Sequence, residues 1–334
     1  MTKISTDSNI LFILSVDTEE EWDWSGPFPE KNFSLENTRN IPEFQEFCNT
    51  LGIRPTYFVD YAVADDLKSS MILRNIAEQN QCEIGGHLHP WCNPPFTGKA
   101  TEERSHVVNL PISLVEEKID LLNQKIKENI GITPRSFRTG RWGINGPVLS
   151  LLEQKGYNLD SSVYPYYSNE FFSCHNFPSE PYWPDLNDPT LKSNQRRIFE
   201  IPVTAGFNRS NFSLMSKIHN TASSSPWNLF KPIGILWQLG LLRKIYLSPE
   251  LSQIDDMLAL VDKVLLSGRK VIHMYLHSSS LRPGCNNFVR NNQDKERLYS
   301  AIKEVVNFIQ LESKVEFCTI SEAGYKLNNS PALA

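Results

Sequence analysis

The stretch I-L-F-I-L-S-V-D-T-E-E-E-W at positions 10–22 indicates most about the fold. Its first seven residues are almost all apolar, as in a strand of a parallel sheet whose two faces are both buried. Four acidic residues follow within five positions. Because side chains alternate along a strand, Asp17 and Glu19 are expected to point the same way at its exit. Such a pair favours a divalent cation or a shared proton, whereas the alternative is a solvated acidic turn.

Apolar runs of this kind recur along the chain and alternate with helical patterns. The further expected strands are 55–59, 82–87, 136–140, 159–163, 198–203, 271–277 and 315–320. Apolar residues spaced by three and four predict helices around 115–130 and 298–309. This alternation predicts a parallel sheet that curls into a closed or partly closed barrel, where reactive side chains gather at the carboxyl ends of the strands.

We expect one α/β domain over residues 8–328, because the expected strands continue on both sides of two loop insertions at about 164–196 and 205–254. The composition, 40% hydrophobic and 21% charged, is that of a globular protein. A net charge of −5 without a basic cluster disfavours nucleic acid as a partner. A small polar substrate fits this composition better.

Six cysteines without a C-x-x-C pair predict reduced thiols, and the N-terminus does not match a signal peptide, so we expect a cytoplasmic protein. The sequence has no run of 18 apolar residues, so it predicts no transmembrane segment. The closest stretch, residues 225–247, is interrupted by charges, a proline and glycines. We expect a helix that covers the barrel there, with peripheral membrane contact as the alternative.

A second reactive motif is G-G-H-L-H-P-W at positions 85–91. His87 and His89 can reach a common metal if the backbone between them is extended. Two histidines and a carboxylate are the usual ligand set of an open catalytic site, which predicts one divalent ion: zinc, with cobalt or nickel as alternatives. Two other interpretations stay open, a closed structural zinc site that adds Cys82 and Cys92, and a purely structural histidine pair.

Two more motifs lie at expected strand ends. In F-R-T-G-R-W-G at 137–143, Arg138 and Arg141 flank a glycine, and a permanently charged arginine can keep a catalytic carboxylate ionised. In V-I-H-M-Y-L-H at 271–277, alternation puts His273, Tyr275 and His277 on one face. His277 at the exit is placed for proton transfer, whereas His273 is expected to be a hydrogen-bonded core residue.

Taken in order, these motifs resemble those of the polysaccharide deacetylase family, the family four carbohydrate esterases with NodB homology. The resemblance adds Asp160 after the Gly156-Tyr157 pair, ends in the L-H pair at 276–277 and T-I-S-E at 319–322, and covers positions 11 to 325. It implies a distorted (β/α)7-8 barrel of TIM-like type. It also implies hydrolysis of the N-acetyl group of an acetamido sugar.

The resemblance further implies a role for each matching residue. Glu19, His87 and His89 would hold the metal ion. Asp17 would be the catalytic base, braced by Arg138.

The catalytic acid would then be His277, tuned by Asp160.

Three departures from the family pattern stand out. The usual adjacent aspartates are replaced by D-T-E at 17–19, and the histidine spacing of four is reduced to two, so His89 maps more securely than His87. Arg141 stands where an aromatic residue's amide normally helps to bind the oxyanion.

Aromatic residues near the strand exits are typical of sugar-binding clefts, although core packing is the alternative for them. Trp24 is one such residue, and the expected substrate-binding residues are Trp22, Trp91, Arg141, Trp142 and Tyr164. The expected substrate is an acetamido sugar in a glycan or in a nucleotide-linked or lipid-linked precursor. Two alternatives remain open, a metal amidase for a non-sugar amide or cyclic imide, and a glycan-binding protein without catalysis.

Overall fold

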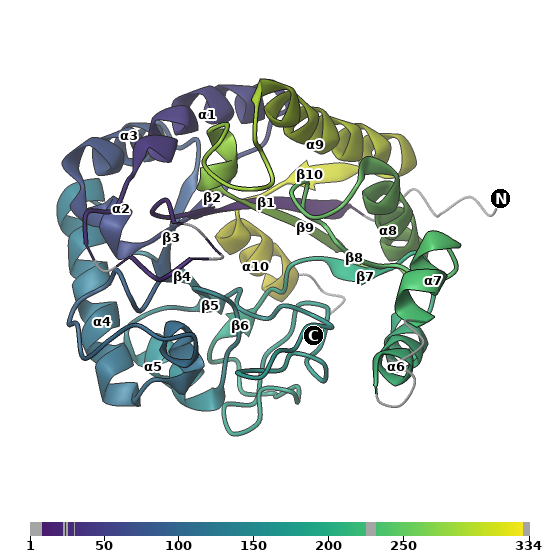
Figure 1. The fold of residues 1–334 in the computed structure, drawn as a ribbon, viewed down its shortest axis with the longest axis horizontal. Coiled ribbons are helices and arrows are strands. Elements are labelled where there is room, and N and C mark those ends of the chain that lie inside the picture. Colours follow the sequence, from purple (N-terminus) through teal and green to yellow (C-terminus); the bar gives the residue numbers. More distant parts are fainter. Residues whose placement is uncertain (1–8, 23, 25, 30, 225–231, 330–334) are drawn as a thin grey trace.

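The computed structural model describes residues 9–329 except 23, 25, 30 and 225–231. An eight-stranded parallel sheet curls through the centre of the molecule, and helices surround it (Figure 1). The strands are β1 Ile10–Thr18, β2 Thr56–Val59, β3 Glu83–Leu88, β4 Ser136–Thr139, β5 Leu159–Asp160, β6 Phe199–Glu200, β9 Val271–His277 and β10 Val315–Phe317. Their order is β10-β1-β2-β3-β4-β5-β6, and β9 pairs with β1.

Helices follow most strands, and most of them pack on the outside of the sheet (Figure 1). They are α1 Ile41–Thr50, α2 Tyr61–Asp65, α3 Leu67–Glu78, α4 Ile112–Lys125, α5 Gly146–Gln154, α6 Phe212–Ser223, α7 Pro232–Gln238, α8 Ile254–Leu266, α9 Asn292–Glu312 and α10 Ile320–Asn329. The two helices expected from apolar spacing are α4 and α9. A single π-helical turn extends α4 to Ile130, and Gly131 ends it with a φ of 85° that suits glycine.

The predicted barrel is confirmed, and its distortion is visible at β5 and β6. All eight expected strands form, but β5 stops at Asp160 instead of continuing to residue 163. The reason is that the next two hydroxyls turn inward, since Ser161 Oγ accepts a hydrogen bond from Arg138 and Ser162 Oγ accepts one from the amide of Thr139. Because these strands are short, part of the barrel wall has no regular ladder of hydrogen bonds between strands.

A seam of irregular backbone closes the wall between β6 and β9. The amide of Thr204 donates to the carbonyl of His273 at 2.9 Å, and the amide of His273 donates to Thr204 Oγ1 at 2.8 Å. Further along β9, the amide of Tyr275 donates to the carbonyl of Leu247. The barrel is therefore closed by loop segments where a regular barrel would have paired strands.

The last helix, α10, closes the amino-terminal end of the barrel. Its first residue, Ile320, donates its amide to Thr56 at the start of β2, and Ser321 bonds to Glu83 at the start of β3. Ile320, Ala323 and Leu327 join a buried apolar cluster inside the barrel together with Leu11, Ile13, Phe58, Leu159, Phe199, Ile201, Val271 and Cys318. A separate apolar layer fills the space between the sheet and the outer helices. The expected strand to residue 320 thus ends earlier, at Phe317, because Ile320 begins this helix.

The two expected insertions differ in structure. Residues 164–196 form turns with isolated β-bridges. The 205–254 insertion contains an antiparallel pair, β7 Ala205–Phe207 and β8 Lys244–Tyr246, together with α6 and α7. In the part of the chain that the structure describes, no helix is long and apolar enough to cross a membrane.

We predict that Gly85→Ala lowers the free energy of unfolding by about 1–3 kcal/mol, as overpacking of a core does. A β-carbon at Gly85 in β3 would lie 2.6 Å from the ring of Phe58 and 2.8 Å from Ser136 Oγ. Urea denaturation of both proteins measures the difference. Gly234→Ala is the matched control, because a β-carbon there meets no atom within 4 Å. Equal losses in both variants would contradict the prediction.

Candidate active site

Three residues that the sequence suggested as metal ligands meet at the carboxyl ends of β1 and β3. One carboxylate oxygen of Glu19 lies 3.2 Å from Nε2 of His89 and 3.9 Å from Nε2 of His87. One possible ligand atom from each residue lies within 4.8 Å of the other two. All three side chains are buried. The alternative of a solvated acidic turn is therefore wrong, since Asp17, Glu19 and Glu20 are at most 3% exposed.

The ring of His87 is oriented by the backbone of β4. Its Nδ1 lies 3.0 Å from the carbonyl oxygen of Arg138, so Nδ1 carries the hydrogen and donates it. Burial lowers the pKa of His87 to about 3, which keeps the ring neutral. Nε2 therefore faces Glu19 with a free lone pair, as a metal ligand must.

A second carboxylate, which the sequence analysis did not single out, stands behind His89. Nδ1 of His89 lies 3.0 Å from Glu20 Oε2, and Trp91 Nε1 donates to the other oxygen of Glu20. Burial lowers the pKa of His89, but the charges of Glu20 and Glu19 outweigh burial and raise it well above its usual value. A carboxylate in this place fixes the tautomer of a metal-binding histidine and directs Nε2 at the ion.

Asp60 and Cys92 surround Glu20 on its far side. The Cys92 thiol donates to Glu20 and to Asp60 at 3.6 Å each, and burial raises the pKa of that thiol well above its usual value. Burial and the neighbouring Glu20 also raise the pKa of Asp60. These protonated groups stabilise the Glu20 carboxylate. Cys82 belongs to neither metal-capable group among the described residues, so the closed zinc site with two cysteines is not formed.

Asp17 is held by the most deeply buried arginine of the site. Arg138 Nη1 donates to Asp17 Oδ1 at 2.6 Å, and the same guanidinium bonds to the carbonyl and hydroxyl of Ser161. Burial raises the pKa of Asp17, but the charges of Arg138 and His277 outweigh burial and lower the pKa below its usual value. Asp17 is therefore ionised, with Oδ2 directed toward His277 at 3.8 Å.

His277, at the end of β9, is paired with a carboxylate that sequence reasoning missed. Glu250 accepts from the backbone amide of His277 at 2.9 Å and contacts Nδ1 at 2.8 Å. Burial lowers the pKa of His277, but Glu250, Glu19 and Asp17 together raise it to about 9. The expected tuning residue, Asp160, instead bonds to Ser162 and lies beside Glu200. Among the described contacts none joins Asp160 to His277, and Glu250 occupies that position beside His277 Nδ1.

His273 is a buried structural histidine, as expected. Its Nε2 lies 2.9 Å from Ser15 Oγ and its Nδ1 lies 3.2 Å from the carbonyl of Pro202. Burial and the nearby Arg138 lower its pKa well below the usual value. The neutral ring joins β1 and β9 to the seam beneath the site.

A cavity of about 290 Å³ opens above these groups. Its lining combines the reactive residues with an aromatic wall and comprises Asp17, Glu19, Trp22, Trp24, His87, His89, His106, Arg141, Trp142, Tyr164, Tyr167, Asn169, Leu251, Tyr275 and His277. In the wall, Trp142 stacks on Tyr164 with ring centroids 4.6 Å apart, and Tyr164 Oη lies 2.6 Å from Tyr275 Oη. Four of the five expected substrate-binding residues thus line the cavity.

The backbone at Arg141 takes an unusual path that opens the cavity. Arg141, Trp142 and Gly143 have φ values of 62°, 62° and 84°, a left-handed conformation that costs energy for the first two residues. The turn lets Trp142 lie over Arg138 while Arg141 reaches out to Glu102 at 2.5 Å. Strain of this kind persists where a site requires it.

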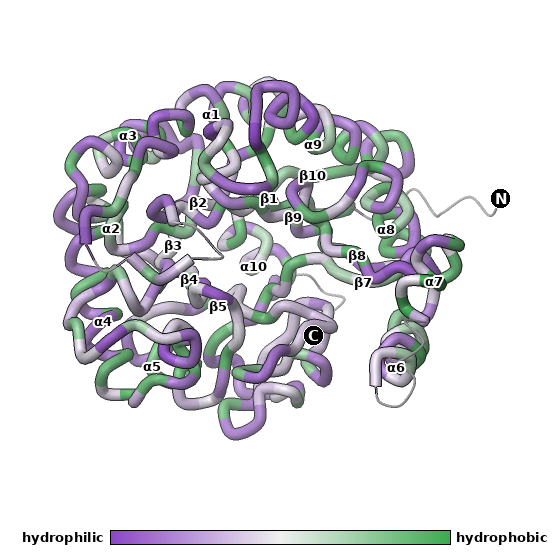
Figure 2. The backbone as a smooth tube through the Cα atoms, viewed as in Figure 1, coloured by the Kyte–Doolittle hydropathy of each residue, from purple (hydrophilic) through white to green (hydrophobic). Residues whose placement is uncertain are grey.

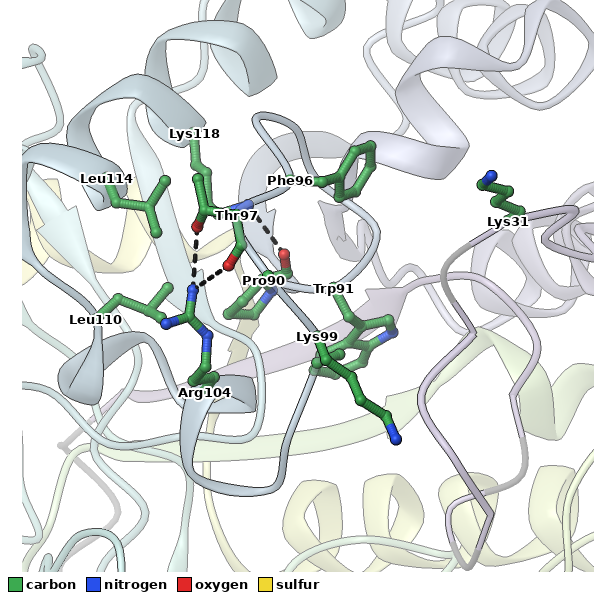
Figure 3. Close-up of a pocket in the computed structure, with 12 residues that line it drawn as sticks. Lys31, Pro90, Trp91, Phe96, Thr97, Lys99, Arg104, Leu110, Leu114 and Lys118 are labelled. Atoms are coloured by element: carbon green, nitrogen blue, oxygen red, sulfur yellow. Dashed lines mark hydrogen bonds between the residues drawn. The ribbon is translucent and has the colours of Figure 1, made fainter.

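Trp91, the fifth expected substrate-binding residue, does not line this cavity. It is 3% exposed and stacks on His89 with ring centroids 4.2 Å apart, so it supports His89 from behind. It lines a second cavity of about 190 Å³ beside the 96–104 loop (Figure 3). There Lys118 donates to the carbonyl of Pro90 and Arg104 bonds to Thr97, so these cations hold the loop in place (Figure 3).

No protein-family model and no curated protein matches the sequence. Solved structures do match. A protein from Mycobacterium smegmatis described as a polysaccharide deacetylase aligns with 98% of this chain and 94% of its own, at a TM-score of 0.57 and 14% identity. The Puue allantoinase aligns with 97% of this chain and 92% of its own, at a TM-score of 0.54 and 14% identity.

The fold is the distorted barrel of the polysaccharide deacetylases. A 4-alpha-glucanotransferase from Thermococcus litoralis also aligns with 95% of this chain, at a TM-score of 0.50 and 15% identity, but over 40% of its own length. The barrel is thus shared by proteins named for different reactions. What this chain does must be argued from its own side chains.

We predict that Glu250→Gln lowers the pKa of His277 from about 9 toward or below its usual value of 6.5. Removing the carboxylate charge leaves burial, which favours the neutral ring. Titration of the His277 ring signals by NMR in chelator-treated protein measures the shift. In wild type the imidazolium is thus present below about pH 9 and lost above it, whereas in the variant it is lost at a lower pH. Asp160→Asn is the control, and an equal shift there would restore Asp160 as the tuning residue.

Proposed function

We propose that this protein is a metal-dependent N-deacetylase that hydrolyses the acetamido group of a sugar. The supporting observation is the convergence, at one cavity, of a metal-capable Glu-His-His group with an ionised carboxylate and a cationic histidine. These are the parts that amide hydrolysis needs, because an amide requires an activated water, a charge to stabilise the oxyanion and a proton for the leaving amine.

The donor set fits a divalent cation. Oε1 of Glu19 is buried and has no hydrogen-bond partner among the described residues, which is costly unless a cation lies nearby. His87 and His89 each direct Nε2 at Glu19, because their Nδ1 atoms are engaged elsewhere. Two imidazoles and one carboxylate favour zinc, with cobalt or nickel as alternatives. A bound ion of this kind supplies Lewis acidity and lowers the pKa of water to about 7.

Asp17 is the general base of the proposed reaction. Arg138 keeps it ionised and fixes Oδ1, so Oδ2 is left to accept a proton at the cavity floor. Asp17 lies on the same face of β1 as Glu19 and two residues before it, which sets the base next to the ligand group. The arginine thus orients the base and takes no part in proton transfer.

His277 is the general acid. At neutral pH it is protonated, and its Nε2 faces the cavity because Glu250 holds Nδ1. Water would add to the carbonyl carbon while Asp17 takes its proton, and the C–N bond would break as His277 gives its proton to the nitrogen. The products would be the free amine and acetate. Asp17 and His277 thus stand in opposite protonation states before the reaction, as a base and an acid must.

The aromatic wall supports a sugar as substrate. Trp22, Trp142 and Tyr164 present rings or ring edges to the cavity, and such surfaces bind the apolar faces of sugar rings. Arg141 at the rim adds a cation for a polar or anionic part of the substrate. The cavity suits a single acetamido sugar unit that continues into a glycan or into a nucleotide or lipid carrier. The free cysteines suit a reducing compartment such as the cytoplasm.

A second candidate is hydrolysis of a non-sugar amide or cyclic imide by the same residues. The likeness to the Puue allantoinase, at a TM-score close to that of the deacetylase, favours it. A glycan-binding protein without catalysis is a weaker candidate, because the ionised Asp17 and the protonated His277 would then have no use.

Acetate release from a panel of acetamido sugars, with and without a metal chelator, tests the proposal. We expect acetate from at least one sugar, loss of release with chelator, and recovery on adding zinc. Release of product only from non-sugar amides would favour the second candidate. A metal-loaded protein that releases nothing from either class would contradict both.

Asp17→Asn is expected to lower the turnover number by about 10²–10⁴-fold, because the amide cannot accept the proton. The metal content should stay near that of wild type, since Asp17 is not among the Glu-His-His donors. Steady-state kinetics and elemental analysis on the same preparation measure the two quantities. Near-normal turnover would rule out Asp17 as the base.

His89→Ala is expected to abolish metal binding. Gly140→Ala should weaken it without removing a donor, because a β-carbon at Gly140 would lie 2.2 Å from the ring of His89. Second-sphere displacements of this kind cost about 10–100-fold in metal affinity. Titration with a zinc-competing dye measures both variants, and Gly234→Ala serves as the control. Full zinc occupancy in His89→Ala would exclude His89 as a ligand.

A further inference from the structure

The helices α6 and α7 and the turn after α7 carry a group of large apolar side chains that are exposed in the described part of the chain. Leu214, Ile218, Ile235, Trp237, Leu239 and Leu241 are each between 42% and 66% exposed, and we refer to them as the α6–α7 surface. Leu214 and Ile218 are four residues apart, as are Ile235 and Leu239, so each pair lies on one side of its helix. Contiguous exposed apolar groups of this kind mark a binding surface.

These helices stand apart from the others. Figure 1 shows α6 and α7 at the edge of the molecule beside β7 and β8, and Figure 2 shows hydrophobic stretches along both. The structure contains no fully buried residue in α7, and Phe212 and Ser216 are the buried residues of α6. The stretch expected to cover the barrel does so only in part, since Leu236 packs against the core and Leu242, Ile245 and Leu247 are buried. Residues 225–231 lie outside the described residues.

The charge of this segment is opposite to that of the rest of the chain. Residues 201–249 contain five of the 33 lysines and arginines and none of the 38 acidic residues. The remaining sequence has 28 basic and 38 acidic residues, a net charge of −10, whereas the segment has +5. Such a separation of charge favours an anionic partner for the segment alone.

The basic side chains are placed around the apolar ones. Arg209 is exposed and bonds to the carbonyls of Gly240 and Leu241, next to two members of the α6–α7 surface. Arg243 lies over the ring of Trp237 while it pairs with Asp256 of α8. Lys217 is exposed on α6 between Leu214 and Ile218. The apolar surface is thus bordered by cations held close to it.

We propose that the α6–α7 surface docks this protein on an anionic membrane surface. Apolar side chains enter the boundary between headgroups and acyl chains, and lysine and arginine beside them attract anionic headgroups. A second copy of this chain fits less well, since two positively charged surfaces would face each other. The sequence analysis kept peripheral membrane contact as an alternative, and the exposed side chains now favour it.

The chain runs from this segment directly into the candidate active site. Glu250, the carboxylate that holds His277, follows the segment, and the next residue, Leu251, lines the cavity and is 46% exposed. If the proposed function holds, the substrate class is then an acetamido sugar carried on a lipid, presented at the same surface. That consequence rests on the proposed function, whereas the docking surface does not.

Co-sedimentation of the full chain with lipid vesicles tests the docking. Vesicles of phosphatidylcholine alone are compared with an equal mixture of phosphatidylcholine and phosphatidylglycerol. We expect binding to the anionic vesicles that weakens as salt is added. Ile235→Asp with Leu239→Asp should lower the partition coefficient at least tenfold, and Arg209→Glu with Lys217→Glu should lower it by roughly fivefold or more for each charge.

Matched controls alter similar residues elsewhere on the surface. Leu311→Asp changes an exposed leucine of α9, and Lys127→Glu with Lys303→Glu changes exposed lysines outside the segment. These should bind like wild type. Equal loss in the controls, absence of wild-type binding to anionic vesicles, or a dimer in sedimentation velocity that the aspartate pair dissociates would each overturn the proposal. Because no substrate is present, vesicle binding and acetate release succeed or fail independently.

Discussion

Three carboxylates buried at the exit of one strand are the constraint on which the rest of this structure depends. Asp17, Glu19 and Glu20 lie within four positions and are almost without solvent contact. Burying even one charge without a partner costs several kcal/mol, so the fold must bring compensation to each. Arg138 comes from β4, His89 from the end of β3, and Glu20 also receives the Trp91 ring hydrogen. A parallel barrel makes this feasible, because the carboxyl ends of its strands meet at one rim.

The cationic side chains of the protein offset only part of this negative charge, which favours a divalent ion. Four carboxylates, those of Asp17, Glu19, Glu20 and Glu250, face two cations, Arg138 and His277. A proton on His89 offsets one further charge when no cation is bound. A divalent cation bound to neutral His87 and His89 would bring the group to neutrality, and it would satisfy the bare oxygen of Glu19. Without a cation, burial raises the pKa of Glu19, so that a proton would have to take the place of the cation.

The strands and the reactive residues could be predicted because both leave local patterns. The apolar run before Asp17 indicated a buried strand, and alternation placed Asp17 with Glu19 and His273 with His277. Glu250 left no such signal, since it comes from an irregular insertion whose path depends on tertiary packing. Trp91 was misplaced for a related reason: the sequence shows an aromatic residue near a strand end but not whether its ring faces the cavity or the core. In the sequence, Glu20 was visible only as part of an acidic cluster. Its role behind His89 depends on its burial, which the alternation of side chains does not reveal.

The 205–254 insertion, whose contribution to the site could not be predicted from the sequence, also joins the proposed site to the proposed docking surface. Glu250 orients His277 only while the chain after β8 keeps its path, and that path begins at the helices that carry the exposed apolar residues. The barrel itself supplies the proposed base from β1 and the metal-capable group from the ends of β1 and β3. The proposed proton donation by His277 therefore depends on the insertion, whereas the proposed cation binding depends on the barrel. In this arrangement the residues proposed to bind the cation stay fixed at the barrel strands. The position of His277 can change with the contacts that the insertion makes.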